Sequence, residues 1–149
     1  MQRFPLDKVL TYRSHLRLEA RNLLAAAMAD ERTLLDHRLQ LERQREQQTT
    51  ELSELLLQES LDVQAAGRRS LFARGLDAEM SVIDEKLVAA RQRVEACRLE
   101  LVKADQDVKA LDRLREKHVA EQTYLEGRKA EHELEEQWLA RTYASLGNM

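Results

Sequence analysis

Apolar side chains recur at alternating three- and four-residue spacings through the second half of the chain. With Met80 taken as position a of a heptad, the apolar residues fall at positions a and d: Met80, Ile83, Leu87, Ala90, Val94, Cys97, Leu101, Ala104, Val108 and Leu111. A seven-residue apolar repeat held over this length is typical of a helix that supercoils around a partner helix. The pattern predicts one long helix over about residues 71–146.

A weaker stripe of the same kind runs through the first half of the chain. Its apolar members are Leu16, Ala20, Leu23, Ala27, Leu34 and Leu41. Pro5 suits the first turn of a helix, where the missing N–H has no cost, and neither Gly nor Pro interrupts residues 6–66. Gly67 is expected to end this helix in the left-handed conformation, and Ser70 to cap the next one. We therefore expect helix one over about residues 5–66 and a turn at about 67–70.

These elements predict an all-α fold, a long antiparallel two-helix coiled-coil hairpin that forms one domain over residues 1–149. A short turn makes consecutive helices antiparallel neighbours. With the turn near residues 68–69, the numbers of two residues that face each other across the hairpin should add up to about 137. Helix two should extend about a dozen residues past helix one. The expected ion pairs are then Arg13 with Glu126, Arg17 with Glu121, and Arg21 with Glu116.

Composition narrows the function classes. Charged residues make up 34% of the chain and aromatic residues 4%, and the net charge is −3. The two signs are interspersed, so the sequence predicts no nucleic-acid partner and no direct attraction to an anionic membrane. No apolar run approaches the roughly 18–20 residues of a membrane span, and no apolar signal core is evident near residue 1. The single cysteine fits a reducing compartment.

No catalytic or metal-binding pattern is evident. A dinuclear site in a helical bundle uses Glu-x-x-His pairs, but Arg115 precedes His118 by three residues and Lys129 precedes His132 in the same way. Cys97 occupies a d position, where a buried and inert thiol is expected. The sequence predicts a protein that is not an enzyme and that binds no metal or cofactor.

Two zones depart from the apolar pattern. Residues 42–51 carry no apolar side chain. In the expected register they lie opposite residues 86–95, which leaves either a groove for another helix or a surface covered by Gln and Arg side chains. From Arg115 to Glu136 every a position is polar, and His118 and His132 stand at d. This end should pair less tightly.

The same end carries features that suit docking. Trp138 and Tyr143 fall beyond the expected end of helix one. Arg13, Arg17 and Arg21 lie on one face, where they are either matched within the hairpin or available to an acidic partner.

Two segments resemble the flagellar FliJ family. The first is RFPLDKVLTYRSHLRLEARNLLAAA, residues 3–27, and the second is LDRLREKHVAEQTYLEGRKAEHELEEQWLA, residues 111–140. The residues that match the family's C-terminal core are Leu111, Leu114, Arg115, Glu116 and Lys117, and Glu135 and Glu136 stand where the family often has an acidic pair. The two segments, their order and the chain length make the resemblance extend over essentially the whole chain.

The resemblance implies a cytoplasmic coiled coil at the flagellar basal body, similar to the central stalk of rotary ATPases. It implies three partners, namely the export ATPase, the cytoplasmic part of the membrane export gate, and export chaperones, with membrane association only through these partners. The candidate ATPase-docking residues are Arg13, Arg17, Arg21, Arg115, Lys117, Trp138 and Tyr143. The candidate gate-binding residues, expected to be exposed beside the turn, are Phe72, Leu76 and Ile83.

Other functions remain open on the sequence. The stalk protein of an injectisome secretion system is similar to this family. A structural coiled-coil spacer without an ATPase partner is a second class, and a nucleic-acid or chaperone-like binder is a third. Phe72 has an alternative role, which is to close the end of the hairpin.

Overall fold

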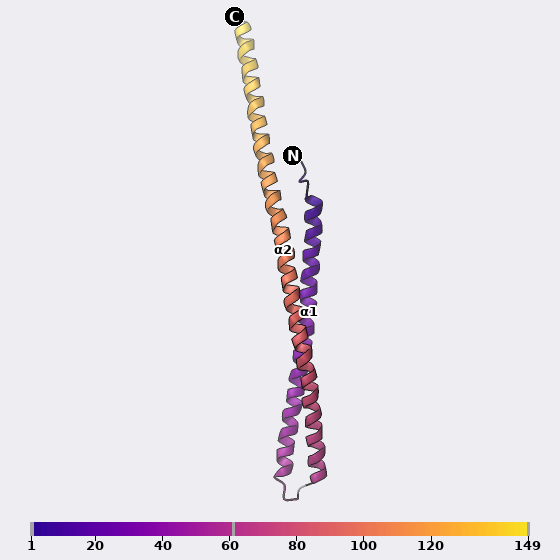
Figure 1. Ribbon diagram of the computed structural model, residues 1–149. Helices are drawn as coiled ribbons and strands as arrows, with labels where there is room; N and C mark the ends of the chain where they lie inside the picture. Colours follow the sequence, from indigo (N-terminus) through magenta and orange to yellow (C-terminus); the bar gives the residue numbers. More distant parts are fainter. Residues whose placement is uncertain (1, 61, 149) are drawn as a thin grey trace. The chain divides into compact units, whose positions relative to one another are not determined.

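The computed structural model describes residues 2–60 and 62–148, which form two long α-helices (Figure 1). Helix α1 covers Asp7–Leu56, 50 residues, and helix α2 covers Val63–Gly147, 85 residues. No strand occurs in these described ranges. The prediction of an all-α chain built from two long helices is confirmed.

The link between the helices lies earlier in the chain than the sequence analysis placed it. α1 ends at Leu56, and α2 begins at Val63 directly after its N-cap, Asp62. Asp62 Oδ1 accepts hydrogen bonds from the backbone N–H groups of Gln64, at 3.1 Å, and Ala65, at 3.2 Å. An aspartate that binds the free N–H groups of the first turn is a strong helix start, so α2 begins there.

The predicted turn at 67–70 is therefore wrong. Gly67 and Ser70 both lie inside α2, and no described glycine has a positive φ. A glycine inside a helix costs only about 1 kcal/mol relative to alanine. An 85-residue helix with a partner tolerates that cost, so Gly67 does not end a helix.

The chain divides into two compact units, each of which contains a stretch of both helices. We call residues 1–18 with 103–149 the terminal unit, and Glu19–Val102 the loop unit, because the latter contains the link between α1 and α2.

The core of the loop unit is a narrow seam of apolar side chains between α1 and α2. Leu41 packs with Leu76, Ile83 and Leu87, and all four are buried. Ala73, Leu76, Ile83, Leu87 and Val94 are the buried α2 residues of this unit. All of them fall on the a and d positions of the heptad counted from Met80, so this register is confirmed here.

On α1 the expected stripe is partly wrong. Ala20, Ala27 and Leu41 are buried as predicted, but Leu23 is 57% exposed. Its neighbour Leu24 is half-buried. Leu23 and Leu24 follow Ala20 by three and four residues, and both spacings are compatible with a heptad. The second of them, Leu24, is the one that lies toward α2.

Ion pairs beside the seam of the loop unit fix which residues face each other. Arg45 Nε lies 2.9 Å from Asp77 Oδ1, and Arg38 Nε lies 2.6 Å from Asp84 Oδ1. Partners on α2 descend in number as those on α1 ascend, which is the order of an antiparallel pair. The residue numbers of these two pairs each total 122. The expected total of about 137 is wrong because the link is centred near residue 60, not near residue 68.

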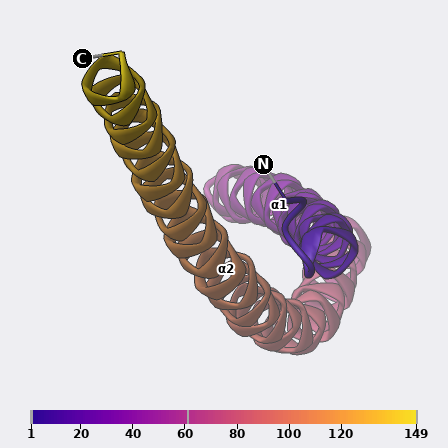
Figure 2. The same cartoon turned by 90° about the horizontal axis from the view of Figure 1, so that it is seen from above.

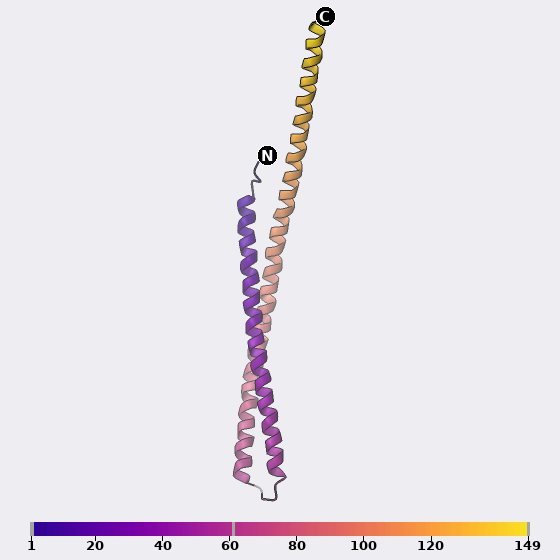
Figure 3. The same cartoon turned by 180° about the vertical axis from the view of Figure 1, so that it is seen from behind.

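The shifted register also removes the groove considered for residues 42–51. These residues do not lie opposite 86–95, and Leu87 and Val94 are both buried. Within this stretch, Arg45 faces the seam and binds Asp77. Views from opposite sides show α1 and α2 side by side along the loop unit (Figure 3).

Replacement of Gly67 tests the position of the link. Gly67 has a helical φ, and nothing lies within 4 Å of an added Cβ. Gly67→Ala should therefore raise the free energy of unfolding by about 0.5–1 kcal/mol, measured by urea denaturation followed by circular dichroism. As the matched control, Asp62→Ala should lower it by about 1 kcal/mol through loss of the N-cap. A loss of stability in Gly67→Ala would restore the turn at residues 67–70.

Candidate docking site

The paired stretch of the terminal unit has an apolar centre flanked by two ion pairs. Leu10 of α1 and Val108 of α2 are buried. Arg13 Nη1 lies 3.3 Å from Asp107 Oδ2, and Arg17 Nη1 lies 3.4 Å from Asp105 Oδ1. Both arginines therefore form ion pairs within the protein, which is the first of the two alternatives considered for them in the sequence.

The partners of the basic stripe differ from those expected. Arg13 and Arg17 bind aspartates at 107 and 105 instead of glutamates at 126 and 121, because the facing residues of α2 lie 16 to 19 positions earlier than expected. Arg21 belongs to the loop unit, is exposed, and makes no hydrogen bond or ion pair with the residues that the structure describes. The three arginines therefore do not act as one set.

Asp105 of the terminal unit binds two cations, Arg17 of α1 and Lys109 of α2. A hydrogen bond from Lys109, with Nζ 2.9 Å from Oδ2, is the main cause that holds the pKa of Asp105 below its ordinary value. Burial is the next largest effect and raises the pKa of Asp105, whereas the charge of Lys109 and the hydrogen bond and charge of Arg17 lower it further. The ionised form of Asp105 is the form that this site stabilises.

His118, which stands at a d position of the seam, contacts residues that precede α1. His118 Nε2 lies 3.1 Å from the carbonyl oxygen of Gln2, and the His118 ring packs on the ring of Phe4 with centroids 5.6 Å apart. His118 is half-buried as a result. A d position at this level faces a carbonyl group and a phenyl ring, so an imidazole suits it better than a leucine would.

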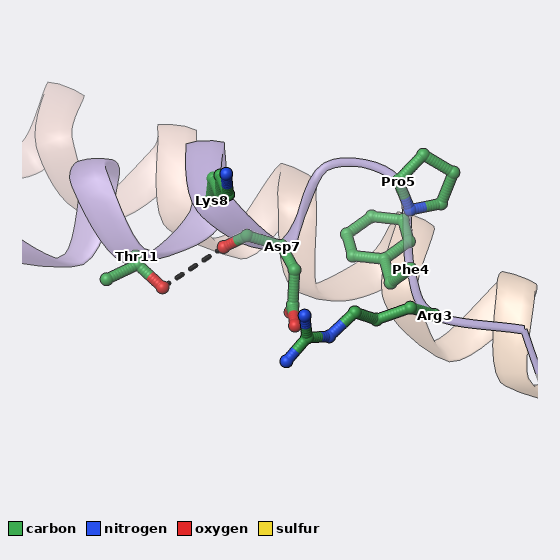
Figure 4. Close-up of a pocket in the computed structure, with 6 residues that line it drawn as sticks. All are labelled: Arg3, Phe4, Pro5, Asp7, Lys8 and Thr11. Carbon is green, nitrogen blue, oxygen red and sulfur yellow. Dashed lines mark hydrogen bonds between the residues drawn. The ribbon is translucent and has the colours of Figure 1, made fainter.

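A shallow hollow lies where the chain enters α1 (Figure 4). Its lining residues are Arg3, Phe4, Pro5, Asp7, Lys8 and Thr11. The Thr11 hydroxyl donates to the carbonyl oxygen of Asp7, at 3.1 Å. Charges of both signs line the hollow, and one short segment supplies all of its residues, so it presents no focused binding site.

Beyond this paired stretch, α2 continues without α1 beside it. We call residues 123–147 the C-terminal segment. Each of its residues is exposed except Thr142, which is half-buried. The yellow end of α2 extends past residues 2–18 and has none of them alongside it (Figures 1 and 2). The segment has about 25 residues, twice the overhang predicted, because the earlier link places residue 2 near His118.

The C-terminal segment carries the exposed aromatic residues that the sequence placed there. Trp138 is 65% exposed and Tyr143 is 71% exposed. The exposed large apolar side chains of the segment are Tyr124, Leu125, Leu134, Trp138, Leu139, Tyr143 and Leu146. Arg115 and Lys117 lie just before it, both exposed, and Arg115 binds Asp112 on its own helix at 3.3 Å.

In the loop unit, the residues predicted to bind an export gate do not share one surface. Phe72 is 54% exposed, whereas Leu76 and Ile83 are buried in the seam with Leu41. The expectation that Leu76 and Ile83 are exposed is wrong, because both occupy d positions. Phe72 lies nine residues into α2 with half its surface exposed, so it does not close the end of the hairpin.

The sequence analysis missed the most exposed apolar residues of the loop unit. Leu57 is 86% exposed, and Val63 and Leu71 are also exposed. Leu57 and Val63 flank the link, and Leu71 lies off the heptad seam. If the N-cap at Asp62 had been recognised from the sequence, Leu57 and Val63 would have been expected beside the link.

Within the described ranges, no group of three or more His, Cys, Asp or Glu side chains could hold a metal ion. No helix in this part of the chain is long and apolar enough to cross a membrane. Cys97 is half-buried at its d position. No family model, curated protein or solved structure matches the chain.

The pH dependence of stability tests the Asp105 site. Because the folded-state pKa is lowered, ionised Asp105 stabilises the protein above the unfolded-state pKa of about 3.8, and this stabilisation is lost as the pH falls through the folded-state value. Asp105→Asn should therefore be less stable than the unaltered protein at pH 7, with a difference that shrinks below pH 4. Lys109→Gln should weaken this pH dependence. The free energy of unfolding of each protein is measured by urea denaturation at each pH. A difference between the two proteins that stays constant from pH 7 to pH 2 would contradict the stabilisation of ionised Asp105.

Proposed function

We propose that this protein is a non-catalytic stalk of the flagellar type III protein export apparatus. In this role it couples the export ATPase ring to the membrane export gate and interacts with export chaperones. The proposal rests on the FliJ-like segments at residues 3–27 and 111–140. The structural observation that carries it is the C-terminal segment, a helix with exposed aromatic side chains and no α1 beside it.

The terminal unit suits a docking role because its two parts differ. Buried apolar side chains and two ion pairs hold α1 to α2, and the residues just before α1 contact His118. Further along α2, the side chains of Trp138 and Tyr143 are exposed. Trp and Tyr are the residue types that most often anchor protein interfaces. We place the main ATPase contact at Trp138 and Tyr143, with Arg115 and Lys117 at its edge.

Arg13, Arg17 and Arg21 take a smaller part in this proposal than the sequence suggested. Arg13 and Arg17 already bind aspartates, so a partner would have to displace those contacts. Arg21 lies in the other unit. We propose that Arg13 and Arg17 hold the pairing of α1 with α2 while the C-terminal segment makes the contact.

The gate contact is proposed at the exposed apolar residues of the loop unit. Phe72 remains from the original set, and Leu71 beside it is also exposed. Leu76 and Ile83 are buried, so in this proposal they do not touch the gate and only stabilise the pairing of α1 with α2. In this proposal the protein resides in the cytoplasm at the basal body and reaches the inner membrane through the gate.

Removal of residues 138–149 tests the docking end. The described residues of this stretch, 138–148, have no α1 residue beside them, so the shortened protein should keep the helical circular dichroism and the unfolding midpoint of the full chain. Stimulation of the purified export ATPase should fall by at least tenfold, because the aromatic anchors are lost. Equal stimulation by the shortened and full-length proteins would refute the proposed docking end. Absence of stimulation by the full-length protein would refute the stalk function itself.

A further inference from the structure

The C-terminal segment is amphipathic although nearly all of its side chains are exposed. At 3.6 residues per turn, its large apolar side chains all fall on one half of the helix circumference. Leu134 and Trp138 lie toward one edge of that half, and Leu139, Tyr143 and Leu146 toward the other. A helix with one apolar side and one polar side is the form that binds in a groove of a partner.

Two glutamates lie inside this apolar half, as do Arg128 and His132, and neither glutamate forms an ion pair with another residue that the structure describes. Glu131 and Glu135, one turn apart, fall between Leu134 and Trp138 on one side and Leu139 on the other. Both are exposed. A partner that covers the apolar side chains must also cover these two carboxylates. Burial of a carboxylate without a partner is costly, so the covering surface must supply cations at both places.

We infer that this face, defined by Leu134, Trp138, Leu139, Glu131 and Glu135, binds an apolar cleft of a protein whose wall carries Lys or Arg side chains. The inference rests on the proposed function, which makes the export ATPase ring the partner. It adds the face of α2 that makes contact and the charge of the surface that receives it.

Charge favours a basic protein surface over the other occupants of such a face. The C-terminal segment has five glutamates against two arginines and one lysine. A second copy of the segment would bring two acidic helices together, and like charges oppose that pairing. The same charges oppose contact with an anionic membrane surface. A cleft lined by apolar and basic residues complements both features.

The experiment compares two charge reversals of equal size on opposite sides of one helix. The test variant is Glu131→Lys with Glu135→Lys. The matched control is Glu133→Lys with Glu136→Lys, which makes the same change in net charge outside the apolar half. Binding of each full-length variant to the purified export ATPase is measured by surface plasmon resonance at several salt concentrations. Circular dichroism establishes that both variants are folded.

The inference predicts that the test variant binds the ATPase at least tenfold more weakly than the unaltered protein, and the control variant within threefold. It also predicts that added salt weakens binding of the unaltered protein more steeply than binding of the test variant, because screening acts on the lost charge pairs. Trp138→Ala should weaken binding by at least tenfold as well.

Other results would overturn the inference. Equal effects of the two charge reversals, or no effect of either, would reject this face as the contact surface. The proposed function would still stand in that case if the unaltered protein binds the ATPase. A dimer in sedimentation analysis that Trp138→Ala converts to a monomer would identify a second copy as the occupant. No binding of the unaltered protein to the ATPase would reject the proposed function and this inference together.

Discussion

The pairing of α1 with α2 depends on an apolar seam that is only one side chain deep. In the loop unit, Leu41 on α1 meets Leu76, Ile83 and Leu87 on α2, and these side chains are the centre of the core. Each helix buries one stripe and exposes the rest of its circumference. Since the described part of the chain contains no third element that covers the helices, the position of that stripe decides which residues of each unit are exposed.

A seam of this kind holds two helices together but specifies their alignment only weakly. Leucines and alanines at successive heptads are nearly interchangeable, so a shift by one heptad changes apolar packing little. Arg–Asp pairs beside the seam remove that ambiguity. Arg38 donates hydrogen bonds to Asp84 and also to the sulfur of Met80, while Arg45 binds Asp77. Exposed ion pairs add little stability each, and their main effect here is to select one alignment.

Some features could be predicted from sequence because they depend on local spacing alone. The heptad from Met80 assigned the seam of α2 correctly, since a seven-residue repeat is visible without knowledge of the partner. The same heptad placed Leu76 and Ile83 at buried d positions, and it was a better guide than the family resemblance that placed them on the surface. The exposure of Trp138 and Tyr143 followed from the absence of a facing residue.

Other features could not be predicted because they depend on the partner helix. Gly67 is a common helix terminator, whereas the actual link has no glycine or proline and is recognised only by Asp62 acting as an N-cap. An error of several residues in the link moved every facing pair by about 15 residues. His118 was equally hidden, because its neighbours Gln2 and Phe4 come from a segment before α1.

The alignment of the two helices determines which residues of α2 have no α1 residue beside them. It can be measured directly in the loop unit with paired cysteines in a Cys97→Ser background. Arg45→Cys with Asp77→Cys should be joined by a short bis-maleimide, since the two side chains are in contact. Arg45→Cys with Gln92→Cys should not, because residue 92 lies about 22 Å further along α2. Efficient cross-linking of the 45–92 pair without the 45–77 pair would contradict the account.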